Sequence, residues 1–175
     1  GDEGFGAYNI GARAWDEMVV ATGLLIAKSA GNDRDDLGDQ NQSGHRHYPD
    51  PGSLYADYHP PDGDWDCVGD IATAKNVITV GALTDPGEMT EFSAWGPGDD
   101  GRVKPDLMAN GEGLWSTCPT DSYCSKRGTS MSTPVVGGIM ALIAQDYIAR
   151  VSADGPTPHF VRALLANTAV DLENP

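Results

Sequence analysis

Positive charge is scarce in this chain of 175 residues. Eleven Lys and Arg residues stand against 26 Asp and Glu residues, which gives a formal net charge of −15 at pH 7. A surface this acidic repels phosphate backbones, so the composition argues against a nucleic-acid partner. The same balance suits a secreted protein, a calcium-binding protein or a protein from a salt-tolerant host.

Long apolar runs are also missing from the chain. A membrane-spanning helix needs roughly 18 or more uninterrupted apolar residues, and no stretch approaches that length. No signal peptide is visible either. The sequence therefore predicts no transmembrane segment and no membrane partner.

The chain holds only three cysteines. Cys118 and Cys124 flank a short loop, and a disulfide between them would favour an oxidising compartment. Two unpaired thiols are the alternative, and the spacing fits no standard zinc pattern. Cys67 is the odd cysteine, either free or paired outside this chain.

Residues 127–134, Arg-Gly-Thr-Ser-Met-Ser-Thr-Pro, are the most informative stretch. They predict that Ser130 lies on a turn that begins with glycine, just before an apolar helix over residues 131–149. A helix start leaves N–H groups unpaired and carries partial positive charge, so a nucleophilic oxygen there lies where negative charge is stabilised. Pro134 suits the first turn of that helix. For an isolated serine, a simple N-cap is the alternative.

Two other features of the sequence bear on this helix. Gly137 and Gly138 weaken it by about 1 kcal/mol each, and close packing against a neighbouring backbone would explain their presence. Upstream, residues 23–32 form an apolar run that ends in Gly31 and Asn32, which predicts a buried strand stopping at a tight turn. Taken alone, that second motif is only a turn.

Together the two motifs resemble the subtilisin-like serine proteases, or subtilases. In that family a Gly-Thr-Ser-Met string carries the nucleophile, which implies that role for Ser130. The Asn of an Ala-Gly-Asn turn points its amide at the oxyanion, which implies that role for Asn32, with the backbone N–H of Ser130 as the other donor. The string differs from the Gly-x-Ser-x-Gly elbow of α/β-hydrolases, because Ser132 follows Met131.

Further segments extend the resemblance from about residue 7 to residue 172. Residues 73–82 are similar to the family strand after the oxyanion loop, and residues 91–96 to its Phe-Ser-x-x-Gly turn. Residues 104–111 are similar to a segment that usually ends Ala-Pro-Gly, with Asn110 in place of Pro, and residues 161–169 to the closing helix. The resemblance implies an α/β, three-layer fold with a mostly parallel sheet, incomplete in this chain.

A working triad also needs a general base and an acid, and the family motifs that carry them do not occur here. The four histidines lack the family's flanking residues: His45, His47, His59 and His159. We therefore interpret residues 1–175 as the C-terminal part of one subtilase catalytic domain, inactive alone, whose partner is the N-terminal half with Asp and His. A non-catalytic peptide-binding module and a calcium-stabilised structural fragment are the alternatives.

A long polar insertion is expected at about residues 33–72. Its acidic residues could make the neighbouring substrate pocket prefer basic side chains, or could form a solvated loop: Asp33, Asp35, Asp36 and Asp39. His45-Arg-His47 could bind a metal ion. Residues 41–43, Asn-Gln-Ser, form a glycosylation sequon.

The resemblance also suggests calcium as a cofactor. Some subtilases bind calcium between an Asp and carbonyl oxygens of the strand after the oxyanion loop, and the matching groups here are Asp106 and the backbone oxygens of Lys75 and Val77. A mixture of carboxylate and carbonyl oxygens suits calcium. The alternative is that Asp106 makes only local hydrogen bonds.

The expected order of elements is typical of a wound α/β sheet. A helix over residues 7–21 has an apolar stripe and is followed by a strand over 23–30 and another over 77–82. Short strands near 113–117 and 123–127 lead to the helix over 131–149 and a last helix over 158–169. The residues of the stripe are Ala7, Ile10, Ala14, Met18 and Ala21, with Trp15 and Val19 beside it.

Overall fold

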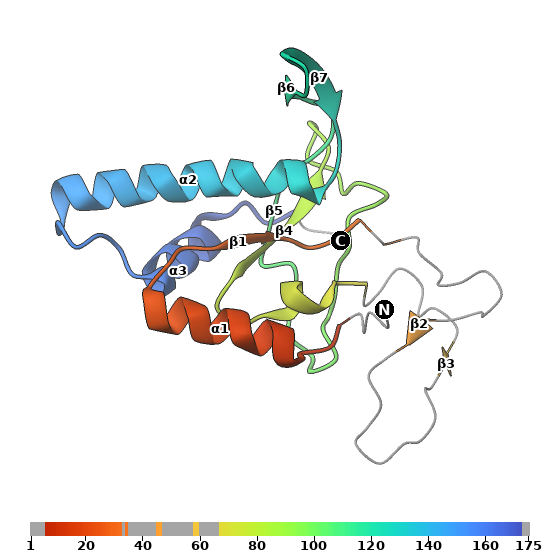
Figure 1. Ribbon diagram of the computed structural model, residues 1–175, viewed down its shortest axis with the longest axis horizontal. Helices are drawn as coiled ribbons and strands as arrows, with labels where there is room; N and C mark the ends of the chain where they lie inside the picture. The colour runs from red at the N-terminus through yellow and green to blue at the C-terminus, as the bar shows by residue number, and fades with distance from the viewer. Residues whose placement is uncertain (1–5, 33, 35–44, 47–57, 60–66, 173–175) are drawn as a thin grey trace.

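The computed structural model describes residues 6–32, 34, 45–46, 58–59 and 67–172 (Figure 1). A parallel sheet with strand order β1-β4-β5 forms its middle layer: β1 (Ala27–Ser29), β4 (Ile78–Leu83) and β5 (Leu107–Asn110). Ala27 pairs with Ile78, and Val80 pairs with Leu107. The predicted α/β fold with a parallel sheet is confirmed.

Helices cover both faces of this sheet: α1 (Ile10–Thr22), α2 (Thr129–Arg150) and α3 (Pro158–Thr168) (Figure 1). Ile78 and Val80 of the central strand pack on one face against side chains of α2 and α3: Val136, Met140 and Val161. Val77, just before the same strand, packs on the other face against Ala12 and Val19 of α1. Burial on both faces explains the nearly unbroken apolar run of the central strand.

Helix α1 presents a different face to the core from the one that its apolar stripe predicts. Ile10 is 87% exposed and Met18 is 37% exposed, whereas Asp16 is 6% exposed. The Asp16 carboxylate accepts hydrogen bonds from the backbone N–H groups of Lys75 (3.0 Å) and Asn76 (2.6 Å). These bonds turn a polar residue inward, so the predicted stripe was wrong about the buried face.

Several element boundaries also differ from the expected ones. β1 is shorter than the predicted strand, because residues 23–26 form no ladder, and β5 was not predicted as a strand. Residues 67–72 belong to the packed body rather than to the insertion, since Cys67, Val68 and Ala72 are buried. The second half of this segment belongs to the 3-10 helix η1 (Asp70–Thr73). Inside the insertion, β2 (His45–Arg46) pairs antiparallel with β3 (Tyr58–His59).

The chain between the sheet and α2 forms a hairpin of β6 (Leu114–Cys118) and β7 (Ser122–Lys126), close to the predicted strands. It projects from the body above the start of α2 (Figure 1). A disulfide joins Cys118 to Cys124, as the sequence predicts, with a Cα–Cα distance of 5.9 Å. Cys67 is buried, and its Sγ lies 3.4 Å from the backbone nitrogen of Trp95.

Replacing both Cys118 and Cys124 with serine is expected to loosen the hairpin rather than the core. A disulfide closing so short a loop stabilises by about 2 kcal/mol. Amide hydrogen exchange should therefore become faster along β6 and β7 and remain unchanged in β4. Replacing the buried Cys67 with alanine is the control and should not alter exchange in the hairpin. If the double mutant and the parent exchange at equal rates along β6 and β7, the prediction is contradicted.

Candidate active site

Ser130 lies within the first turn of α2 and is exposed. The helix begins at Thr129, earlier than predicted, and Gly128 is its N-cap residue with φ 141°. Pro134 therefore lies inside the helix rather than in its first turn. Because proline has no N–H, the carbonyl of Ser130 lacks its usual helical partner four residues on.

Asn32 lies directly against the start of this helix. Its Oδ1 accepts hydrogen bonds from the backbone N–H of Thr129 (2.8 Å) and from Thr129 Oγ1 (3.1 Å). Thr129 Oγ1 also contacts both backbone groups of Gly31, at 3.2 Å from its oxygen and 3.3 Å from its nitrogen. The structure thus brings the two sequence motifs together across a separation of 97 residues.

Thr129 and Gly111 position this junction, and the sequence had assigned a role to neither. The Gly128 N–H donates to Gly111 O (2.8 Å), and the Gly111 N–H donates to Leu83 O (2.9 Å). A Cβ atom on Gly111 would lie 2.6 Å from the Cβ of Ala82, so only glycine fits there. This chain of bonds joins the end of β4 to the turn that carries Ser130.

The arrangement can stabilise negative charge beside Ser130. Because Asn32 Oδ1 accepts both bonds from Thr129, the NH₂ end of the amide is the one that can donate to a further group. The start of α2 adds N–H groups and partial positive charge at the same point. Two fixed donors beside a hydroxyl are the elements of an oxyanion hole.

No side chain in the described part of the chain hydrogen-bonds to Ser130 Oγ. His159 lies at the start of α3, beside Phe160, whose ring packs on Tyr147 with centroids 5.1 Å apart. Tyr147 is about 25 Å from Ser130 along α2, at about 1.5 Å of rise per residue. His159 is therefore out of reach of the serine.

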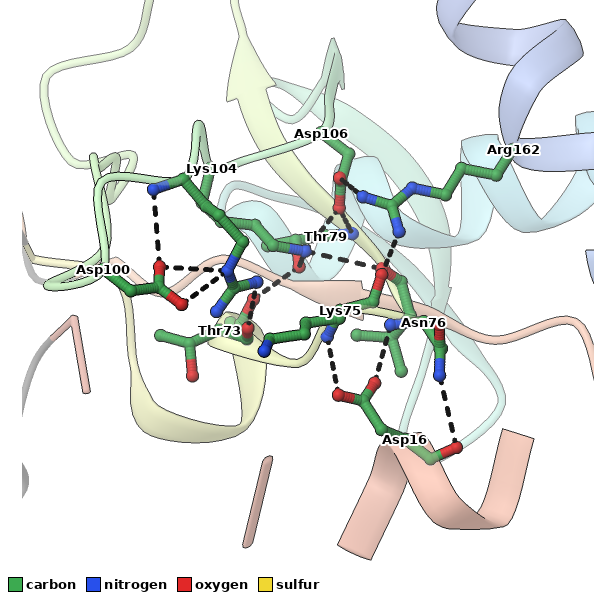
Figure 2. Close-up of polar contacts among 12 residues, drawn as sticks. Asp16, Thr73, Lys75, Asn76, Thr79, Asp100, Lys104, Asp106 and Arg162 are labelled. Carbon is green, nitrogen blue, oxygen red and sulfur yellow. Dashed lines mark hydrogen bonds and ion pairs between the residues drawn. The ribbon is translucent and has the colours of Figure 1, made fainter. Parts of the chain in front are cut away.

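The three groups suggested for calcium lie together at the junction of β4, β5 and α3, but with other partners (Figure 2). Asp106 accepts from Lys104 Nζ (2.7 Å), from the Thr79 N–H (2.8 Å) and from Arg162 (2.6 Å). Arg162 also donates to the Lys75 carbonyl, and Lys104 Nζ lies 3.5 Å from Val77 O.

Lys104 is the buried member of this group, with a side chain that is 1% exposed. Burial lowers the pKa of its ammonium, and the charge of the neighbouring Asp106 carboxylate acts in the opposite direction. The sequence had not singled out Lys104 or Arg162, because neither the lysine before Pro105 nor an arginine in the last helix signals a buried ion pair.

Other predicted features fall outside the described residues: Asp33, Asp35, Asp36, Asp39, His47 and the sequon at 41–43. Within the described residues no three His, Cys, Asp or Glu side chains gather as a metal site. None of the described helices is both long and apolar enough to cross a bilayer.

The fold and the site define a class: a wound α/β domain with a serine at a helix start beside an asparagine amide. The sequence model of the subtilase family matches residues 4–175, so the chain belongs to this family. The family and the subtilisin-like fold that the sequence implied are thereby confirmed.

Relatives and solved structures agree with this assignment. The chain is 42% identical over 60 residues to a C5a peptidase of Streptococcus pyogenes serotype M18, covering 34% of this chain and 5% of that protein. It is 36% identical over 107 residues to the alkaline elastase YaB of a Bacillus species, covering 61% of this chain and 25% of the elastase. The patellamide maturation protease PatA has a similar fold, with a TM-score of 0.69 and 23% identity over 97% of this chain and 50% of that one.

These coverages have a consequence for function. The chain spans only a small part of the curated relatives that it matches and half of the PatA chain. Membership of a protease family is shown, while activity, substrates and partners belong to the whole protein.

Proposed function

We propose that this chain carries the nucleophile and the oxyanion hole of a subtilisin-like serine endopeptidase. The observation that carries the proposal is the junction of Asn32, Thr129 and Ser130, where an amide donor and a helix start flank an exposed hydroxyl. A degenerate, peptide-binding relative could lack the nucleophile or the oxyanion residue, and this chain has both.

The proposed reaction begins when Ser130 Oγ bonds to the scissile carbonyl carbon and gives its proton to a base. Asn32 Nδ2 and the Ser130 N–H donate hydrogen bonds to the oxyanion. These hydrogen bonds strengthen as the carbonyl oxygen gains negative charge. The C–N bond then breaks, the amine leaves with the proton, and water hydrolyses the acyl-enzyme by the reverse proton path. The base and the acid that orients it come from residues outside this chain.

The surface beside β1 supports a partner that completes the sheet. Within the described residues β1 pairs with β4 alone, and no described strand lies along its other edge. Between this edge and α2 lies a hollow of about 690 Å³, which extends from Ser130 to Ala144 and is lined by Leu25, Ala27 and Gly137 among others. Gly137 meets no described atom within 4 Å of an added Cβ, so another backbone can approach it closely.

Three other apolar side chains of α2 are exposed but lie outside the lining of this hollow: Val135 is 40%, Ile139 42% and Leu142 66% exposed. A parallel strand from the N-terminal half, added to the edge of β1, would cover the hollow and bring the base and acid toward Ser130. The disulfide of the β6–β7 hairpin supports a secreted enzyme in an oxidising compartment. Proteins or peptides are the proposed substrates.

A fluorophosphonate probe, read out by intact mass, tests the proposal. The complete protease should gain one adduct, and peptide mapping should place it on Ser130. This chain produced alone should remain unlabelled, because the serine has no base. An unlabelled complete protease would contradict the proposed function, and a labelled isolated chain would contradict the external origin of the base.

A further inference from the structure

One carboxylate, that of Asp106, whose side chain is 11% exposed, joins three elements of the fold (Figure 2). It lies just before β5, accepts from the N–H of Thr79 in β4, and pairs with Arg162 of α3. We propose that Lys104 and Arg162 supply the positive charge for which the sequence suggested calcium, so that this junction is held together without a metal ion.

Each oxygen in the suggested calcium set already has a cationic nitrogen beside it. Lys104 Nζ lies 2.7 Å from Asp106 Oδ2 and 3.5 Å from Val77 O. Arg162 lies 2.6 Å from Asp106 Oδ1 and donates to the carbonyl of Lys75. Lys104 Nζ also lies 3.1 Å from Thr79 Oγ1, so the ammonium has several oxygen partners, as a bound cation would.

A calcium ion does not fit among these groups. Calcium takes about six to eight oxygen ligands, and here one carboxylate and two carbonyls are offered. The two side chains already place two positive charges around one negative charge, and a divalent ion would add two more in a site where the Lys104 side chain is 1% exposed. Like charges at such short range, away from water, repel strongly.

The cluster also explains how α3 is attached to the sheet. The apolar contact of α3 with the core runs through Val161 and Leu165. Arg162 follows Val161 in the helix, and its guanidinium points toward the sheet. It binds Asp106, just before β5, and the carbonyl of Lys75, just before β4. A forked guanidinium suits this task, because its donors have fixed directions.

Thermal melting with and without calcium tests this inference in the complete protease. All variants carry Ser130→Ala, which prevents self-digestion during the melt. Asp106→Asn should lower Tm by about 5–10 °C, because it leaves Lys104 buried without its counter-ion. Arg162→Met should lower Tm by about 2–5 °C, because its side chain is partly exposed.

Calcium response is the decisive readout. We expect the difference in Tm between excess calcium and EDTA to be the same in the parent, in Asp106→Asn and in Arg162→Met. A calcium response that is present in the parent and reduced in Asp106→Asn would overturn the proposal. So would an Arg162→Met protein whose Tm in calcium equals that of the parent, which keeps the test decisive if Asp106→Asn fails to fold.

The exposed pair Arg150–Asp146 provides the matched control. Its side chains are 77% and 61% exposed, and they form an Arg–Asp contact of 2.6 Å on one face of α2. Asp146→Asn and Arg150→Met make the same chemical changes as the test variants. Both should change Tm by less than about 2 °C, because exposed ion pairs contribute little.

Discussion

Replacing Ser130 with alanine in the complete protease is expected to lower kcat by about 10⁶-fold for a peptide substrate. The reason is that the acyl-enzyme cannot form without the hydroxyl, which leaves only the residual acceleration of the oxyanion hole and substrate binding. Stability should be almost unchanged, because Ser130 is exposed and none of the described residues bonds to its Oγ. Peptidase kinetics and thermal melting of the same samples check both parts.

Ser125→Ala is the matched control for that experiment. Ser125 is an exposed serine on β7, a few residues before the nucleophile, and pairs with Trp115 across the hairpin. Its replacement should leave kcat within about twofold of the parent, since a surface substitution away from the site has little effect. Activity of Ser130→Ala within a hundredfold of the parent, beyond any contaminating protease, would reject Ser130 as the nucleophile.

Asn32→Asp is expected to lower kcat by at least about 10²–10³-fold, with a smaller effect on KM. The aspartate keeps an oxygen that can accept the bonds from Thr129, but it replaces the amide donor with a negative charge beside the oxyanion. The loop should therefore hold its position while transition-state stabilisation is lost. Initial-rate kinetics measure the first effect, and thermal melting shows whether the fold is kept.

Thr129→Val separates anchoring from catalysis at the same junction. It removes the hydroxyl that contacts Gly31 and Asn32, but it retains the backbone N–H that donates to Asn32. We expect a loss of about 1–3 kcal/mol of stability, because the partly buried backbone N–H and carbonyl of Gly31 lose a partner. The fall in kcat should be smaller than in Asn32→Asp; equal kcat losses in both would show that Asn32 acts only by holding the turn.

Local signals explain what could be predicted about the fold. The turn of Gly31 and Asn32, the hairpin around Cys118 and the last helix, which begins after Thr157, all depend on residues close in sequence. In the structure, Thr157 Oγ1 accepts from the Phe160 N–H, as a cap should. The order of the helices and of most strands followed from local signals as well, but β5 was missed.

Longer-range features were missed for an equally physical reason. The apolar stripe of α1 predicted the wrong buried face. Asp16 turns inward because it binds two N–H groups that lie about sixty residues further along the chain. Thr129 reads as an ordinary helix-start residue until Asn32 is placed against it. Lys104 and Arg162 have no sequence signal that distinguishes them from surface cations. Lys104 lies two residues from its partner Asp106 and is buried only by the surrounding fold, whereas Arg162 reaches Asp106 because α3 packs against the start of β5.

By itself, the sequence determined the family, the serine and asparagine motifs, the cysteine pair and the order of the elements other than the short ones such as β5, since each of these depends on residues that lie close together in the chain. Tertiary structure alone decided that Thr129 links the two motifs, which face of α1 is buried, and that Arg162 of α3 pairs with Asp106. These features depend on groups brought together from distant positions in the chain. Burial there removes water, which strengthens each hydrogen bond and each interaction between charges.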